Sequence, residues 1–305
     1  MNRILVAALA ALALAGATAA KAADMPLKAP PPSPAPVSWT GFYVGGFAGG
    51  AWDSPGASST DAFTTGPAPG GGGLPIGTSG DGYNPWPYPF GNNGFGGATF
   101  GYNWQAVGVP IVFGGEIEAG YIKVSGAGPA VTSFSPSGVF GGSPCPNPPF
   151  TTACATSSAT VGNWFVAETV RLGWLWTPSF LFYVKVGVAE SRLSSSYNIN
   201  CAPCGTLLAP AVFTNIAAAS NIWGPVAGFG VEYLVSPRWS VKAEYEYFDF
   251  NGASVQPVGT IGCTACAGIS GTPIRSTTSL ISGIQTAKVG INYRFDWGSP
   301  VVARY

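Results

Sequence analysis

The chain has 305 residues, of which 44 are glycine, and its formal net charge is zero. Only 9% of the residues are charged, against about 25% in a typical soluble domain, so the composition argues against an ordinary soluble surface and against nucleic-acid binding. Histidine is absent, which excludes histidine-dependent catalysis and histidine-bearing metal motifs; we predict no enzyme, no metal and no cofactor.

The N-terminus has the three parts of a signal peptide. Arg3 supplies the positive charge, residues 4–16 form an apolar stretch of about thirteen residues, and Ala20-Lys21-Ala22 ends the segment with small residues. The apolar stretch is too short to span a bilayer. We predict a signal peptide over residues 1–22, cleaved after Ala22, followed by a proline-rich periplasmic linker over residues 23–38.

Eight apolar-patterned runs follow, each long enough for a tilted membrane strand. They cover about 41–52, 94–104, 110–122, 161–176, 180–191, 221–234, 239–250 and 284–295. Short turns alternate with long Gly/Ser/Thr/Pro-rich connections, and no unbroken apolar run could form a transmembrane helix. This order predicts an all-β fold: an eight-stranded antiparallel up-and-down transmembrane β-barrel over 39–297, with four long extracellular loops. Residues 298–305 are then a periplasmic C-terminal tail.

Charged residues within the runs alternate with apolar ones. In VKAEYEYFDF, from Val241 to Phe250, Lys242, Glu244 and Glu246 share one face. A soluble sandwich would turn that face outward, whereas a membrane barrel turns it inward; the whole chain favours the barrel. The same alternation predicts an inward set of five acids and five bases: Glu116, Glu118, Glu232, Glu244, Glu246, Arg171, Lys185, Lys242, Lys288 and Arg294.

An eight-stranded barrel is only wide enough for side chains to fill its interior. Because buried charges must pair, this balanced set favours a salt-bridged, largely closed lumen. The alternative is an ion-selective pore lined by the same residues. Two positions depart from the pattern: Glu168 falls on the lipid face, and Pro225 lies inside a strand. Glu168 is expected at the interface or after a bulge, and Pro225 at a bulge or at the strand's outer end.

Tryptophans fall where the predicted strands end. We assign Trp39, Trp104, Trp176, Trp239 and Trp297 to a periplasmic aromatic girdle, while Trp52, Trp164 and Trp223 lie near the opposite ends. Ordinary aromatic core packing is the alternative.

Six cysteines form three local pairs in the long loops. These are Cys145 with Cys154, Cys201 with Cys204, and Cys263 with Cys266. An even count in an exported chain favours disulfides. A zinc site built from the two C-x-x-C pairs and a thioredoxin-like redox role are the alternatives.

The end of the last run, KVGINYRF, is similar to the C-terminal signal that the outer-membrane barrel-assembly machinery reads, with Lys288, Gly290, Tyr293 and Phe295 at its positions. The stretches WTGFYVGG from Trp39, GYNWQ from Gly101 and GVEYLVSPRWSVKAEYEYFDF from Gly230 resemble the outer-membrane immunogenic proteins of alphaproteobacteria. The resemblance covers the strands and both ends of the chain. The chain departs from that family in three ways: a ten-residue tail follows the assembly signal, the loops carry three cysteine pairs, and Phe47 stands where a polar lumen residue is expected.

The resemblance implies a small porin-like surface barrel with roles in envelope integrity and antigenicity. We expect a structural, surface-exposed protein of the outer membrane. Its expected partners are membrane lipid, lipopolysaccharide and the assembly machinery, and oligomer formation is left open. A weak porin for small hydrophilic solutes and a secreted β-rich binding module are the alternatives.

Overall fold

The computed structural model describes residues 38–53, 56–62, 83–128, 131–132, 154–201, 212–260, 262–263 and 273–295. Contacts divide the chain into two units, Met1–Pro36 and Val37–Tyr305, and all described residues belong to the second. The predicted signal peptide, the linker up to residue 37 and the C-terminal tail lie outside the described residues, and their boundaries stay predictions. None of the described residues forms a helix long and apolar enough to cross a membrane.

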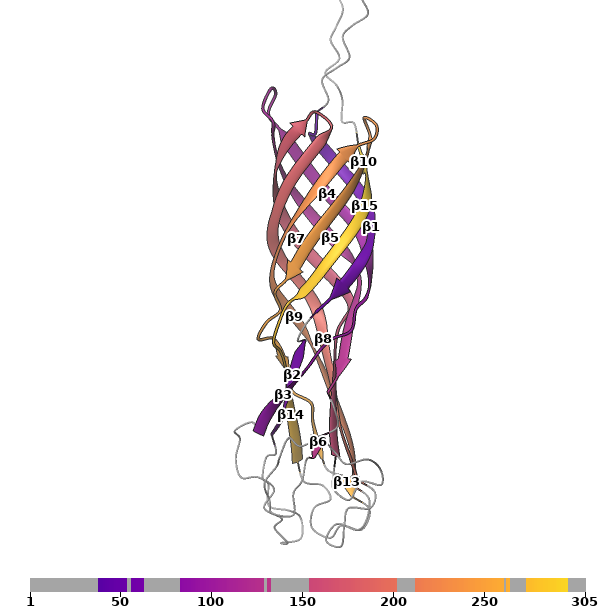
Figure 1. Cartoon of the computed structure of the whole chain (residues 1–305), viewed down its shortest axis with the longest axis vertical. Helices are drawn as coiled ribbons and strands as arrows, with labels where there is room; N and C mark the ends of the chain where they lie inside the picture. The colour runs from indigo at the N-terminus through magenta and orange to yellow at the C-terminus, as the bar shows by residue number, and fades with distance from the viewer. Residues whose placement is uncertain are drawn as a thin grey trace, which may run out of the picture. The chain divides into compact units, whose positions relative to one another are not determined.

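Eight antiparallel strands form a closed ring (Figure 1). They are β1 (Gly41–Trp52), β4 (Asn93–Gln105), β5 (Ile111–Ala127), β7 (Cys154–Thr177), β8 (Phe180–Cys201), β9 (Val212–Leu234), β10 (Trp239–Phe248) and β15 (Ile284–Arg294). Neighbours in sequence are neighbours in the ring, β15 pairs with both β1 and β10, and the pairing of β9 with β10 completes the circle. The predicted eight-stranded up-and-down barrel is confirmed.

The two ends of the barrel differ in the length of their connections. Short turns join β4 to β5, β7 to β8 and β9 to β10. The first and last strands meet at this same end, because the backbone carbonyls of Ser38 and Pro237 both accept hydrogen bonds from Arg294. In bacterial barrels short turns face the periplasm and long loops face outward.

The long connections contain more structure than the sequence pattern indicates. Four barrel strands run past the predicted apolar runs: β5 to Ala127, β7 from Cys154, β8 to Cys201 and β9 from Val212. A second, five-stranded sheet is formed by β2 (Ala57–Ala62), β3 (Tyr83–Tyr88), β11 (Ser254–Val255), β12 (Val258–Thr260) and β14 (Pro273–Leu280). Two short strands pair with the extensions, β6 (Val131–Thr132) with β7 and β13 (Gly262–Cys263) with β9.

Side chains alternate between the interior and the outer surface along each barrel strand. In β5, Val112, Glu116 and Glu118 are buried, whereas Phe113 and Ile117 are about half exposed. A strand turns successive side chains to opposite faces, so the apolar set lies outside and the charged set inside. Since the outward face is apolar, lipid and not water is its natural surrounding.

Candidate functional site: the filled interior of the barrel

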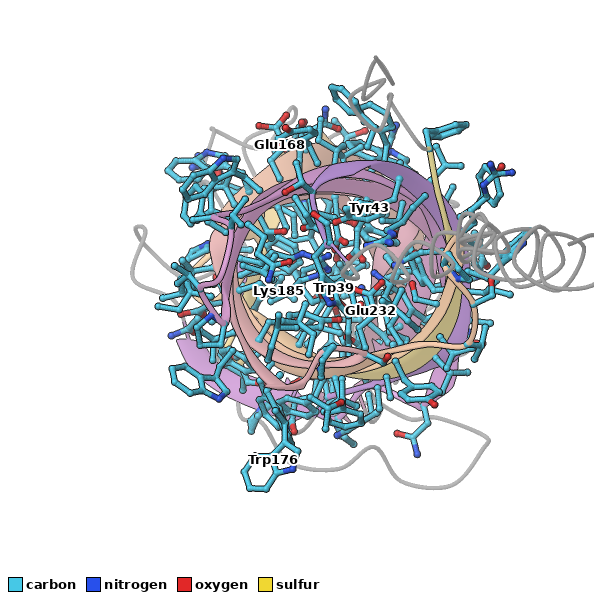
Figure 2. All side chains as sticks on the ribbon, turned by 90° about the horizontal axis from the view of Figure 1, so that it is seen from above. Trp39, Tyr43, Glu168, Trp176, Lys185 and Glu232 are labelled. Atoms are coloured by element: carbon cyan, nitrogen blue, oxygen red, sulfur yellow. The ribbon has the colours of Figure 1, made fainter. Side chains whose placement is uncertain are left out.

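All ten charged residues predicted to point inward are buried in the barrel. Seen down the barrel, Lys185 and Glu232 lie within the ring, whereas Glu168 and Trp176 project outside it (Figure 2). Every member of the set is at most 7% exposed. The structure therefore brings together side chains from six strands, β5, β7, β8, β9, β10 and β15.

Three lysines form the centre of this network. Lys185 Nζ lies 2.9 Å from Glu116 Oε1 and also pairs with Glu246. Lys242 Nζ is 3.0 Å from Glu244 Oε2 and 3.3 Å from Glu116 Oε2. Because β5 and β10 are four places apart in a ring of eight, the contact between Lys242 and Glu116 joins opposite walls.

Lys288 completes the central layer from the last strand. Its Nζ is 2.9 Å from Glu246 Oε2 and 3.1 Å from Glu244 Oε2, and it also contacts Glu118. The ammonium lies 4.4 Å from the centre of the Phe47 ring, a cation–π contact. Phe47 thus faces the lumen and covers the network with an apolar ring.

Arg171 and Glu232 form a second layer beside the first, 3.0 Å apart. The guanidinium lies between two tyrosine rings, 4.8 Å from the centre of Tyr43 and 5.0 Å from that of Tyr183. Both hydroxyls donate to the central layer at 2.7 Å, Tyr43 to Glu116 and Tyr183 to Glu244. The tyrosines therefore link the two layers.

Sequence reasoning missed the uncharged polar partners of this network. Asn292 donates to Glu232 at 2.9 Å, and Asn103 accepts from Arg171 at 2.8 Å. Tyr43, Tyr183, Asn103 and Asn292 all occupy inward positions of their strands, so the same alternation could have identified them. The charged residues were the more conspicuous signal.

The periplasmic end of the interior is sealed by Trp39, which corrects its assignment to the girdle. Trp39 is fully buried and packs with Val112, Leu181, Tyr183 and Leu234. Figure 2 shows it inside the ring. Its indole N–H donates to the carbonyl of Pro178 at 3.1 Å. Because the Trp39 indole has apolar neighbours and a hydrogen-bond acceptor inside the barrel mouth, both its ring and its N–H are satisfied without contact with the lipid interface.

Arg294 belongs to this seal and not to the central network. Its guanidinium donates to the carbonyls of Ser38 at 2.6 Å and Pro237 at 2.8 Å, and it lies 5.5 Å from the centre of the Trp39 ring. The described ion pairs of the interior involve the other nine charged residues. Because Arg294 is the last residue of β15, it reaches backbone acceptors at the mouth more easily than carboxylates further in.

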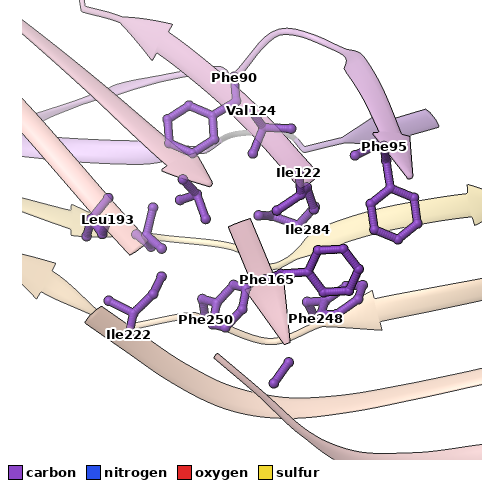
Figure 3. Close-up of a cluster of buried hydrophobic side chains, with 14 of the residues drawn as sticks. Phe90, Phe95, Ile122, Val124, Phe165, Leu193, Ile222, Phe248, Phe250 and Ile284 are labelled. Carbon is purple, nitrogen blue, oxygen red and sulfur yellow. The ribbon is translucent and has the colours of Figure 1, made fainter. Parts of the chain in front are cut away.

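An apolar layer closes the interior on the loop side (Figure 3). The Phe95 and Phe165 rings lie 5.1 Å apart in a tilted arrangement, and Phe165 meets Phe248 edge to face at 5.9 Å. The cluster continues through Ile122 and Leu193 to residues of the second sheet, among them Ala57, Tyr88 and Leu280. The interior is therefore filled along its length by the Trp39 seal, two charged layers and the phenylalanine layer.

Inward glycines make room for these large side chains. Glu244 pairs with Gly230 across strands, and a Cβ on that glycine would lie 2.8 Å from Glu244 Cγ and from the Tyr183 ring. A Cβ on Gly101 would lie 2.3 Å from the Tyr43 ring. The barrel thus alternates long side chains on one strand with glycine on the next, which accounts for part of the high glycine content.

The remaining girdle residues lie on the outer surface. Trp104, Trp176 and Trp239 are all exposed, with Trp176 at 76%. Trp297 lies outside the described residues. Of the tryptophans near the opposite ends, Trp223 is 77% exposed.

The candidate assembly signal lies on β15 and directly after it. Tyr293 and Phe295 pack edge to face at 5.3 Å on the outer surface, and Gly290 leaves room for the stem of Lys242. Lys288 points inward, so the same residue serves the network. Recognition by the assembly machinery stays a prediction.

Two irregular positions are accommodated in different ways. Glu168 is exposed on the outer face between Ile117 and Val188. Pro225 lies just outside the ladder between β9 and β10, which ends at Val226, so its missing N–H interrupts no pairing there.

The disulfide candidates stay predictions. Cys145, Cys204 and Cys266 lie outside the described residues. Cys154, Cys201 and Cys263 belong to β7, β8 and β13.

The geometry favours a structural role for the carboxylates over metal binding. Oxygens of Glu116, Glu118 and Glu244 lie within 4.8 Å of one another. Lys242 Nζ lies within 3.3 Å of all three groups. An ammonium therefore occupies the position that a metal cation would need.

A closed ring with an apolar exterior and a filled polar interior defines a β-barrel of the outer membrane. A family model described as outer membrane protein beta-barrel domain matches residues 7–295, and the chain belongs to that family. It is 28% identical over 309 residues to the 31 kDa outer-membrane immunogenic protein of Brucella melitensis, covering 97% of this chain and 100% of the relative. The protein of that name from Brucella suis gives the same values.

Solved structures of outer-membrane proteins also match. OprG from Pseudomonas aeruginosa is 12% identical, with 84% of this chain and 97% of that chain covered and a TM-score of 0.41. Ail, the attachment invasion locus protein of Yersinia pestis, is 10% identical, with 84% and 99% covered and a TM-score of 0.32.

Proposed function

We propose that this protein is a structural, surface-exposed component of the outer membrane whose barrel is closed to solutes and has no catalytic role. The observation that carries the proposal is the ion-pair network that joins β5 to β10 across the lumen. Water-filled pores need a continuous polar path, whereas here a fully buried indole and a phenylalanine layer lie on either side of the charges.

Energetics favour a permanent seal over a gate. Removing one partner from a buried ion pair costs about 3–5 kcal/mol, and each central lysine contacts at least three carboxylates. Opening a path through the lumen would separate several of these pairs at once. The stability of a whole domain is only about 5–15 kcal/mol, so such an opening would cost a large part of it.

A surface role is supported from the other end of the barrel. The strands β5, β7, β8 and β9 continue beyond the apolar band and carry a second sheet at the loop end. The Brucella relatives are named as immunogenic outer-membrane proteins, which fits exposure of this end outside the cell.

The test is single-channel recording of the refolded mature protein in a planar bilayer. Folding is checked by heat-dependent migration in gels, and a conducting porin in the same bilayer shows that openings would be detected. We expect no discrete openings over many insertions. Steady openings would contradict the closed lumen; exchange of Lys242 for glutamate would then alter ion selectivity, whereas Glu190→Lys on the outer face would not.

A further inference from the structure

Two basic side chains of the barrel strands point outward. The basic residues of these strands that point inward are Arg171, Lys185, Lys242, Lys288 and Arg294. Lys123 in β5 lies between the buried Ile122 and Val124, and Arg192 in β8 lies between the buried Ser191 and Leu193. Both therefore face away from the interior, and neither has an ion pair within the described ranges of the chain.

A bulge in β7 separates these two cations. Lys123 lies opposite Gly162, and the register between β7 and β8 shifts between Val161 and Phe165, beside Arg192. Within the bulge Asn163 has a φ of 75°, the one positive φ of a non-glycine residue in the described part of the chain. Bulges that re-aim a side chain are often found at functional positions. Here the bulge exposes Asn163 between two cations that are two strand spacings, about 10 Å, apart.

The bulge lies at the loop-side edge of the lipid-facing band. Trp164 belongs to it, and the strongly exposed Trp223 pairs with Glu190, two residues before Arg192. Interfacial tryptophans mark the boundary of the apolar zone. On the periplasmic side of these tryptophans, the outward side chains of β8 are Val184, Val186 and Val188.

On the loop side of this boundary, the outward side chains carry hydroxyl and amide groups. The side chains on β7 and β8 there are Thr156, Ser158, Thr160, Ser194, Ser196 and Asn198. Ser158 and Ser196 hydrogen-bond across the strands at 2.8 Å. Together with Lys123, Asn163 and Arg192 these residues form what we call the Asn163 platform.

We propose that the Asn163 platform binds the phosphorylated saccharide headgroup of lipopolysaccharide. Lys123 and Arg192 would bind phosphate groups, since two cations at the edge of the lipid-facing band complement the phosphates in charge. Asn163 and the hydroxyl face would hydrogen-bond sugar, while the acyl chains continue down the adjoining valines. A free polysaccharide would leave that apolar continuation unused, and an anionic phospholipid has no saccharide for the hydroxyl face.

One carboxylate lies at the rim of the platform. Glu190 accepts a hydrogen bond from the Asn221 side chain at 3.2 Å. A carboxylate beside phosphates is unfavourable unless a divalent cation joins them. Binding should therefore weaken when divalent cations are chelated.

The experiment measures binding of fluorescent rough-type lipopolysaccharide to the refolded full barrel in a zwitterionic detergent. Lys123→Gln, Arg192→Gln and their double variant are compared with Arg238→Gln, which removes one exposed charge from a short periplasmic turn. Folding is checked for each by heat-dependent migration. Dephosphorylated lipopolysaccharide and phosphatidylglycerol are the comparison ligands.

We expect the double variant to lose affinity by roughly tenfold or more, since each cation near an anionic lipid surface contributes measurably. Arg238→Gln should bind as the wild type does, and dephosphorylated lipopolysaccharide should bind all variants equally weakly. An unchanged affinity of the double variant would overturn the proposal. So would an equal loss for phosphatidylglycerol, which would indicate general attraction to anionic lipid. The inference does not depend on whether the lumen conducts.

Discussion

Replacing Lys185 by methionine tests the buried network directly. The substitution keeps the length of the side chain and removes its charge. Lys185 is about 1% exposed and contacts four carboxylates, those of Glu116, Glu118, Glu244 and Glu246. Leaving these carboxylates short of one cation in a buried site should lower the free energy of unfolding by about 3–5 kcal/mol. Denaturant unfolding of the detergent-folded barrel, followed by tryptophan fluorescence, measures this change.

Two controls separate charge from packing. Arg192→Met makes the same kind of change on the same strand but at an exposed position, so it should alter stability by at most about 0.5 kcal/mol. Adding Glu246→Gln to Lys185→Met restores the charge balance and should recover about 1 kcal/mol or more. A loss below 1 kcal/mol for Lys185→Met, or strictly additive losses in the double variant, would show that the network is not coupled as described.

Three further predictions are also measured by denaturant unfolding, the first two in detergent and the third in lipid vesicles. Gly101→Ala should cost about 1–3 kcal/mol, because its Cβ would enter a tyrosine ring, whereas Gly50→Ala, with nothing within 4 Å of the new Cβ, should cost less than about 1 kcal/mol; equal costs would contradict the packing argument. Trp39→Ala should cost about 3–5 kcal/mol as for other buried aromatic truncations, and a much smaller loss would argue against the periplasmic seal. Glu168→Leu should raise stability in lipid vesicles by about 1 kcal/mol, since a charge on the lipid face is unfavourable, and no shift in the denaturant midpoint would place Glu168 in water.

Alternation within the strands, taken with the eight evenly sized runs and the low charge of the whole chain, was sufficient to predict the ring and the inward direction of its charges. Lys242, Glu244 and Glu246 had to share a face because a strand has a period of two, and the low charge of the whole chain indicated which face is wet. Pairing partners could not be read in this way. The contact of Lys242 with Glu116 depends on two strands meeting across the lumen, which requires the size of the ring and the stagger of the strands.

The errors have equally local causes. Trp39 was assigned to the girdle because of its place at a strand end, but the narrow mouth lets it turn inward, where it packs on Arg294. The outer parts of β7 and β8 were interpreted as loop because serine and threonine replace the apolar residues of the membrane band. Beyond the membrane, the extensions of β7 and β8 have water on their outer face and the second sheet on their inner face. Polar side chains are therefore compatible with strand pairing there.

The place of Lys288 on the last strand ties neutralisation of the interior to closure of the ring. Glu118 comes from β5, and Glu244 and Glu246 come from β10, so a sheet that lacks β15 still holds these carboxylates. A ring that stops one strand short keeps them without their third ammonium, at a cost of about several kcal/mol for a buried unpaired charge. Closure of the ring therefore also supplies a cation of the network, and an incomplete or misregistered barrel is penalised electrostatically as well as by its open edges.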